Sequence, residues 1–276
     1  MQSTRWVAGV VMGWALVGGT ASAQRATQRP DSMVARGPLF TTTDAWLTGG
    51  FAAATVLVWP LDESLAKRSQ RPSIQNNAAL KNTATVFRNL ADPGTVIISV
   101  GLWGAGWLTH DQTMAEVGLY SGEAIAASGV VGWVIKSVAG RARPRVNINR
   151  PRDFKLGRGF GSAGDYQSFP SGHTLAAFSL AAAVTAESGK FWPHEQLLIG
   201  VLTYGGATLS GLSRMYNNAH WASDVVLGAG IGTLSGVMAV RWNELHPANW
   251  FDRTLLHLTM APSAGGGMDV GYHAAW

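Results

Sequence analysis

Six uncharged, largely apolar stretches recur along the chain, and polar or basic connections separate them. Their length, their alanine and leucine content and the near absence of alternation between apolar and polar positions predict helices rather than strands. They lie at residues 45–61, 93–110, 124–135, 174–186, 196–213 and 225–240. The sequence therefore predicts an all-α fold, a helical bundle of about six core helices.

The two ends of the chain depart from this pattern. Residues 1–23 carry a basic residue, then an apolar stretch, then Ala-Ser-Ala, which predicts an export signal cleaved after Ala23. A retained membrane anchor is the alternative. Polar residues 24–43 predict a flexible leader before a helical domain at 44–252. Residues 253–276 alternate and contain a run of glycines, which predicts a short C-terminal β-hairpin.

Composition limits where such a protein works. The 276-residue chain has no cysteine, so stability must come from helix packing and not from disulfides. A membrane span needs roughly 20 apolar residues, whereas the six stretches are 12 to 18 residues long and mean hydropathy is only +0.10. We therefore expect a periplasmic protein that contacts a membrane surface, with a membrane-integral bundle as the alternative.

Three short clusters carry the candidate chemistry, in a fixed order. Their sequences are KSVAGRARP at 136–144, PSGH at 170–173 and SRMYNNAHWASD at 213–224. Together they supply three permanent cations, two histidines and a carboxylate, the set needed to bind a phosphate-like oxyanion, attack it and protonate the leaving group. In an up-and-down bundle the clusters fall at the same end, so we expect the active site to gather there.

The histidines and the carboxylate suggest separate roles. Asp224 follows His220 by four residues, so on a helix the two side chains share a face. A carboxylate bonded to one ring nitrogen leaves the other nitrogen free to attack phosphorus, which makes His220 the candidate nucleophile. His173 precedes an apolar helical run and is the candidate general acid and base.

The remaining residues of the clusters are suited to holding the oxyanion. Lys136, Arg143 and Arg214 would neutralise the non-bridging oxygens, where charge must be held during phosphoryl transfer. Ser171 adds a hydroxyl donor, and Gly172 lets the backbone approach closely.

The three clusters resemble the three-part signature of the type 2 phosphatidic acid phosphatase superfamily, which also contains bacterial acid phosphatases and vanadium haloperoxidases. The resemblance, with helical flanks, covers a catalytic core at 117–242. It implies that His220 is phosphorylated with Asp224 as its partner, that His173 is the acid and base, and that the other cluster residues bind phosphate. It also implies that no metal or other cofactor is needed, and that vanadate would bind as a phosphate mimic.

The sequence thus predicts a metal-independent phosphatase working through phosphohistidine. Its substrate is a phosphorylated small molecule or lipid: a lipid phosphate, a polyprenyl diphosphate, a nucleotide or a small organic phosphate. One alternative is a vanadium-dependent haloperoxidase, although Thr174 after the histidine resembles the phosphatases more. Another is a non-catalytic envelope protein that binds anions or lipid.

A strongly basic segment at 141–158 separates the first two clusters. It contains no recognisable nucleic-acid-binding module, so we expect no nucleic-acid partner. Among its basic residues only Arg143 lies in a signature position. We interpret most of the others as solvated, where they would steer phosphorylated substrates inward. The glycine-rich residues 157–165 are expected to shape the mouth of the pocket. Glu123 is expected either to make a structural hydrogen bond or to lie on an exposed helix face.

Overall fold

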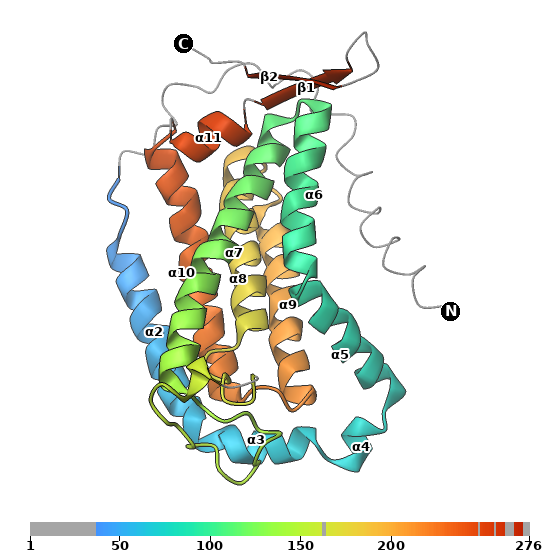
Figure 1. Ribbon diagram of the computed structural model, residues 1–276, viewed down its shortest axis with the longest axis vertical. Helices are drawn as coiled ribbons and strands as arrows, with labels where there is room; N and C mark the ends of the chain where they lie inside the picture. Colours follow the sequence, from blue (N-terminus) through green and yellow to red (C-terminus); the bar gives the residue numbers. More distant parts are fainter. Residues whose placement is uncertain (1–36, 162–163, 248, 257, 263–267, 273–276) are drawn as a thin grey trace. The chain divides into compact units, whose positions relative to one another are not determined.

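Long helices make up most of the computed structural model, which describes residues 37–161, 164–247, 249–256, 258–262 and 268–272. Six helices of 16 to 28 residues form the bundle in this part of the chain (Figure 1). They are α2 (Thr42–Val58), α6 (Gly94–Thr109), α7 (Gln112–Ala139), α8 (Gly172–Phe191), α9 (Gln196–Tyr216) and α10 (Ala222–Leu245). Each coincides with one of the six apolar stretches, so the predicted fold class is confirmed.

Shorter elements connect and close the bundle. They are η2 (Trp59–Leu61), α3 (Asp62–Ser69), α4 (Pro72–Gln75), α5 (Ala78–Ala91), η3 (Arg158–Phe160), α11 (Trp250–Leu255), β1 (Leu258–Pro262) and β2 (Met268–Tyr272). The two strands pair antiparallel, as predicted for the tail. The predicted export signal, most of the predicted leader and the glycines of the hairpin turn lie outside the described residues.

Helix α7 begins 12 residues before the apolar stretch at 124–135 that predicted it. Asp111 caps its first turn by accepting a hydrogen bond from a backbone N–H. Glu116 and Glu123 interrupt the apolar pattern but lie within the helix. Glu123 accepts a hydrogen bond from Asn243 of α10 at 2.5 Å, the structural role expected for it.

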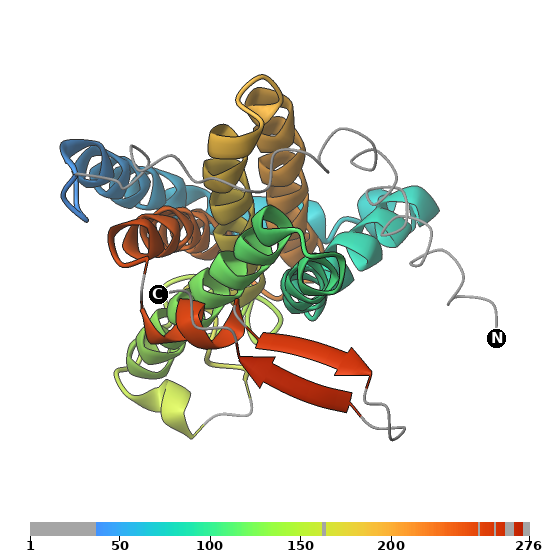
Figure 2. The same cartoon turned by 90° about the horizontal axis from the view of Figure 1, so that it is seen from above.

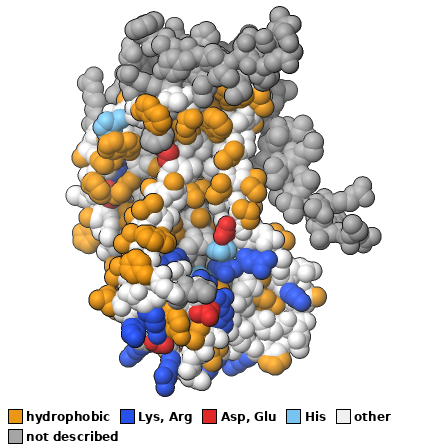
Figure 3. Space-filling view, viewed as in Figure 1, with side chains coloured by type: hydrophobic (Ala, Val, Ile, Leu, Met, Phe, Trp, Pro, Cys, Tyr) orange, Lys and Arg blue, Asp and Glu red, His pale blue; other side chains and the backbone are white. Residues whose placement is uncertain are grey.

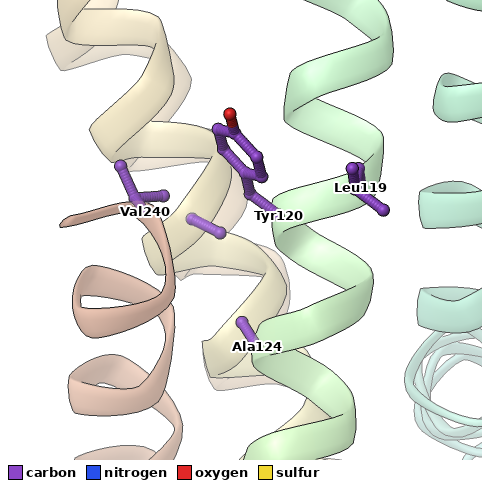
Figure 4. Close-up of a cluster of buried hydrophobic side chains, with 5 residues drawn as sticks. Leu119, Tyr120, Ala124 and Val240 are labelled. Carbon is purple, nitrogen blue, oxygen red and sulfur yellow. The ribbon is translucent and has the colours of Figure 1, made fainter. Parts of the chain in front are cut away.

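Helix α8 is the centre of the bundle and packs against α7, α9 and α10 (Figure 2). One buried apolar cluster joins three of these helices (Figure 4). It consists of Leu119, Tyr120 and Ala124 from α7, Ala183 from α8 and Val240 from α10. The apolar cluster lies in the part of these helices away from the ends that carry the three catalytic clusters.

A row of glycines lets α10 lie directly against the backbone of α8. A Cβ atom at Gly232 would lie 2.4 Å from the carbonyl oxygen of Leu175, and one at Gly236 would lie 2.6 Å from that of Ser179. Small residues at such spacing permit close helix approach. This contact sets the distance between the first turns of α8 and α10, which carry His173 and Asp224.

We expect Gly232→Ala to destabilise the protein by about 1–3 kcal/mol, because the added methyl group must push α8 and α10 apart. The measurement is the midpoint of thermal unfolding. Gly205→Ala is the matched control, since Gly205 lies in α9 with no atom within 4 Å of the new Cβ. A Gly232→Ala midpoint equal to that of the control would contradict the close packing.

The last four long helices bring their catalytic clusters to one end of the bundle, near α3 (Figure 1). The chain reaches this end as α7 finishes, leaves it along α8, returns along α9 and leaves again along α10. Among the described helices, α7 and α10 are long and apolar enough, by length and composition, to cross a membrane.

Candidate active site

A cavity of about 350 Å³ opens at this end of the bundle. Five of the eight predicted site residues line it: Lys136, Arg143, Gly172, His173 and His220. In Figure 3, Lys and Arg side chains gather at the same end of the visible face, around a histidine and an acidic side chain. The predicted gathering of the clusters at one end is therefore what the structure shows.

The other three predicted residues are buried and do not line the cavity: Ser171, Arg214 and Asp224. Ser171 caps the start of α8 and accepts a hydrogen bond from the hydroxyl of Thr174 at 2.8 Å. Arg214 is close enough to act electrostatically on His173. The structure thus brings all eight residues to one end of the bundle, and five of them face the cavity while three are buried.

The ring of His220 is held by a backbone carbonyl. Its Nδ1 lies 2.7 Å from the carbonyl oxygen of Ser168. Because a carbonyl only accepts hydrogen bonds, Nδ1 must carry the proton and Nε2 keeps its lone pair. Burial lowers the pKa of His220 to about 3, so the ring is neutral at neutral pH. A neutral ring with a free Nε2 is the form that can attack phosphorus.

The predicted hydrogen bond between Asp224 and His220 is replaced by a longer contact. Nδ1 of His220 lies 3.7 Å from Oδ2 of Asp224. The reason is that α10 begins at Ala222, so His220 precedes the helix and the spacing of a regular helix does not apply. Oδ2 accepts instead from the Ser168 hydroxyl at 2.5 Å and from the Trp221 backbone at 2.8 Å. Ser168 therefore links Asp224 to His220.

The second histidine occupies the first turn of α8, where backbone N–H groups favour an anion. Nε2 of His173 lies 3.8 Å from Oδ2 of Asp92, an exposed residue immediately after α5. Lys136, Arg143 and Arg214 all act electrostatically on this ring. Asp92 is the acidic side chain that counters their charge at the cavity.

The cations of the site are oriented by backbone carbonyls. Nζ of Lys136 donates to the carbonyl oxygen of Pro170, next to the second cluster. Nε of Arg143 donates to the carbonyl oxygen of Gly164 at 2.6 Å, so the glycine-rich segment contributes to the site by positioning this arginine. Because these acceptors are neutral, the hydrogen bonds orient the two side chains without neutralising them, which suits them to bind a phosphate group.

Known proteins with a similar sequence have been compared with this chain. The model of the PAP2 superfamily matches residues 118–247. This stretch, a little less than half of the chain, is similar to that superfamily. The resemblance inferred from the three clusters is thereby confirmed, and the match includes all eight predicted site residues within the PAP2 domain.

Two relatives of the PAP2 domain illustrate how far the likeness extends. A lipid A 1-phosphatase of Porphyromonas gingivalis is 45% identical over 78 residues, which are 28% of this chain and 17% of that relative. The chain therefore matches less than a fifth of the length of this curated relative. The crystal structure of a transmembrane PAP2-type phosphatidylglycerolphosphate phosphatase from Bacillus subtilis matches with a TM-score of 0.56 at 20% identity. That match covers 76% of this chain and all of that one, and it shows a shared helical fold.

Arg141 and Arg158 are exceptions in the basic segment at 141–158, most of whose basic residues are exposed as expected. Arg141 is fully buried and donates to Oδ1 of Asp224 at 2.5 Å. Arg158 donates to the carbonyl oxygen of Gly140 at 2.7 Å and closes the loop against the end of α7. Arg141 thus belongs to the active-site support of the PAP2 domain, although it stands between the signature positions.

Proposed function

We propose that the protein is a metal-independent phosphatase that hydrolyses lipid phosphate monoesters or diphosphates through a phosphohistidine at His220. One observation carries the proposal: the cavity joins a cationic, histidine-bearing wall to an apolar wall. The polar wall fits a phosphate group, and the apolar wall fits the part of a lipid next to it.

In the first chemical step, Nε2 of His220 attacks phosphorus, a bond forms between them, and the bond from phosphorus to the leaving oxygen breaks. Without substrate, burial and the charges of Arg214, Lys136 and Arg143 lower the pKa of His173 to about 3. The bound phosphate dianion compensates those cations and favours a proton on His173. His173 gives this proton to the leaving oxygen, so the alcohol leaves neutral. Lys136 and Arg143, which line the cavity, hold the non-bridging oxygens as charge develops on them. The buried Arg214 adds its positive charge without lining the cavity.

In the second step, water attacks the phosphorus and the bond to Nε2 of His220 breaks. His173, which has lost its proton, accepts one from the water and returns to its starting form. Inorganic phosphate leaves. Throughout, Nδ1 of His220 keeps its proton and donates it in a hydrogen bond to the carbonyl oxygen of Ser168. The protein supplies every proton transfer from its own side chains, so the proposal needs no metal or other cofactor.

The apolar wall gives the reason for preferring a lipid substrate. It is formed by Ala91, Thr95, Val96, Ile125 and Ala176. Val96 is also half exposed, and Ile97 and Val100 continue an exposed apolar surface along α6. A hydrocarbon chain attached to the phosphate can therefore leave the cavity along α6 without entering water.

The outer surface of the bundle fits a membrane location. Exposed apolar side chains spread over the face of Figure 3. Over the whole bundle, exposed apolar side chains of α7 and α9 include Val130, Trp133, Leu197, Leu198, Val201 and Leu202. Exposed apolar surface on this scale marks contact with lipid or protein. We propose that this surface contacts lipid. We also propose that residues 1–23 direct export, so that the enzyme works at a membrane surface in the periplasm.

The test is phosphate release from a substrate panel in the presence of EDTA: long-chain phosphatidic acid, a polyprenyl diphosphate, glycerol phosphate and p-nitrophenyl phosphate. We expect the lipids to have the highest kcat/KM. Val96→Asn should raise KM for phosphatidic acid about 10-fold and leave glycerol phosphate unchanged, because only the lipid chain contacts this wall.

The matched control is Leu198→Asn, which makes the same kind of change at an exposed apolar position of α9 that does not line the cavity. Equal use of glycerol phosphate and phosphatidic acid by the wild type would contradict the lipid preference. Loss of all turnover in EDTA would contradict the metal-independent mechanism, and vanadate-dependent bromide oxidation without phosphate release would indicate a haloperoxidase.

A further inference from the structure

Behind Asp224, on the side away from His220, lies a second buried layer of charge. Nη1 of Arg141 donates to Oδ1 of Asp224 at 2.5 Å, and Nη2 donates to Oδ2 of Asp62 at 2.6 Å. None of the three side chains is exposed to solvent. One guanidinium therefore bridges two carboxylates, and we call these three residues the charge cluster.

Ser223 fixes the protonation state of Asp62 in the charge cluster. Its backbone N–H donates to Oδ1 of Asp62 at 2.8 Å, and its hydroxyl donates to Oδ2 at 2.6 Å. With the bond from Arg141, Asp62 accepts three hydrogen bonds, the behaviour of an ionised carboxylate. Burial raises the pKa of Asp62, while the Arg141 charge and the Ser223 donors oppose that shift.

Aromatic rings surround the guanidinium of Arg141. Its Cζ lies 4.9 to 5.8 Å from the centroids of four rings, those of Trp59, Phe154, Phe169 and Trp221. The rings replace water around the cation and leave the two carboxylates as its charged partners. Charge interactions are stronger in such surroundings than in water. The net charge of the charge cluster therefore affects the free energy of a charged group beside it.

The charge cluster carries one excess negative charge, because two carboxylates face one guanidinium. While His220 is neutral, the positive charges that act on Asp224 from the cavity side are those of Lys136 and Arg143. When Nε2 bonds to phosphorus and Nδ1 keeps its proton, the ring becomes positive and the local charges cancel. Without Asp62, Arg141 would neutralise Asp224, and no negative charge would be left for the phosphorylated ring.

We propose that Asp62 and Arg141 are positioning residues for phosphoryl transfer, which hold Asp224 in place and keep its negative charge available to the phosphorylated His220. This inference rests on the proposed function. Asp62 begins α3 and lies outside the segment that matches the superfamily. The α3 region thus contributes to catalysis through Asp224, without contacting the substrate.

Asp62→Asn tests the inference, since it removes the charge and hardly changes the volume. We expect kcat for phosphatidic acid to fall about 10- to 100-fold while KM stays within about threefold, because the lost stabilisation belongs to the phosphorylated ring. Inhibition by orthovanadate, which bonds to Nε2 of His220 as phosphorus does, should weaken about 10-fold. Inhibition by inorganic phosphate, which needs only the cations, should not change.

The matched control is Asp44→Asn. Asp44 is also a buried carboxylate paired with an arginine, accepting from Nη1 of Arg241 at 2.6 Å, but it lies in the first turn of α2, away from the site. An effect of stability alone would appear in both variants. Arg141→Lys is a second variant that keeps the positive charge and loses the bridge, and it should weaken vanadate inhibition in the same way.

The vanadate measurements separate failure of this inference from failure of the proposed function. Wild-type vanadate affinity in Asp62→Asn and Arg141→Lys, or an equal loss in Asp44→Asn, would overturn the inference. Vanadate binding can be followed by tryptophan fluorescence without turnover. A wild type that releases no phosphate but binds vanadate more tightly than Asp62→Asn would therefore contradict the proposed function and support the charge cluster. A wild type that binds no vanadate would overturn both.

Discussion

Replacing His220 by asparagine is expected to lower phosphate release from every substrate by about 10⁴-fold or more, because no other group can supply the attacking Nε2. The fold should survive the change. The asparagine amide can donate to the carbonyl oxygen of Ser168, as Nδ1 of His220 does at 2.7 Å. The measurement is steady-state phosphate release, with thermal unfolding to show that the variant is folded.

His194→Asn is the matched control for this variant, since His194 is exposed and lies outside the three clusters. It should retain wild-type turnover. Phosphate release by folded His220→Asn within a factor of ten of the wild type would show that another residue is the nucleophile.

The effect of His173→Gln is expected to depend on the leaving group. With phosphatidic acid, whose alkoxide leaves poorly, the loss of the general acid should cost about 10²- to 10⁴-fold in kcat/KM. With p-nitrophenyl phosphate, whose leaving group needs little protonation, kcat/KM should fall much less. Comparing kcat/KM for the two substrates in the wild type and the variant measures the proton transfer directly.

The second step supplies an internal control for His173→Gln. Because the variant also lacks the base that activates water, the phosphoenzyme formed from p-nitrophenyl phosphate should accumulate and give a burst of p-nitrophenolate. Equal losses on both substrates, with no burst, would contradict the assignment of His173 as acid and base and would suggest that it only binds phosphate.

The fold could be predicted from the sequence because each long helix carries an uncharged stretch longer than a strand. The boundaries were less predictable where polar residues lie inside the bundle. Glu123 immediately precedes the apolar stretch at 124–135, but it lies inside α7, where it accepts a hydrogen bond from Asn243, 120 residues away. No local pattern reveals such a partner.

The sequence predicted which residues carry the candidate chemistry, but not the residues that hold them in place. Lys136, His173 and His220 stand at helix ends that the topology brings together, so their meeting followed from the sequence. Arg141 looked like one more solvated cation, because its partner Asp62 lies 79 residues earlier in the chain. Ser168 was missed for a related reason: it acts on His220 through its backbone carbonyl, which any residue type would provide.

The most direct test of the central claim is to trap the phosphoenzyme by rapid quenching with ³²P-labelled phosphatidic acid. We predict label on the wild type that is stable to alkali and lost in acid, as expected for phosphohistidine, and located in the peptide that contains residue 220. The label should be absent from His220→Asn and increased in His173→Gln. Turnover without any trapped label, or label that remains in His220→Asn, would contradict the account.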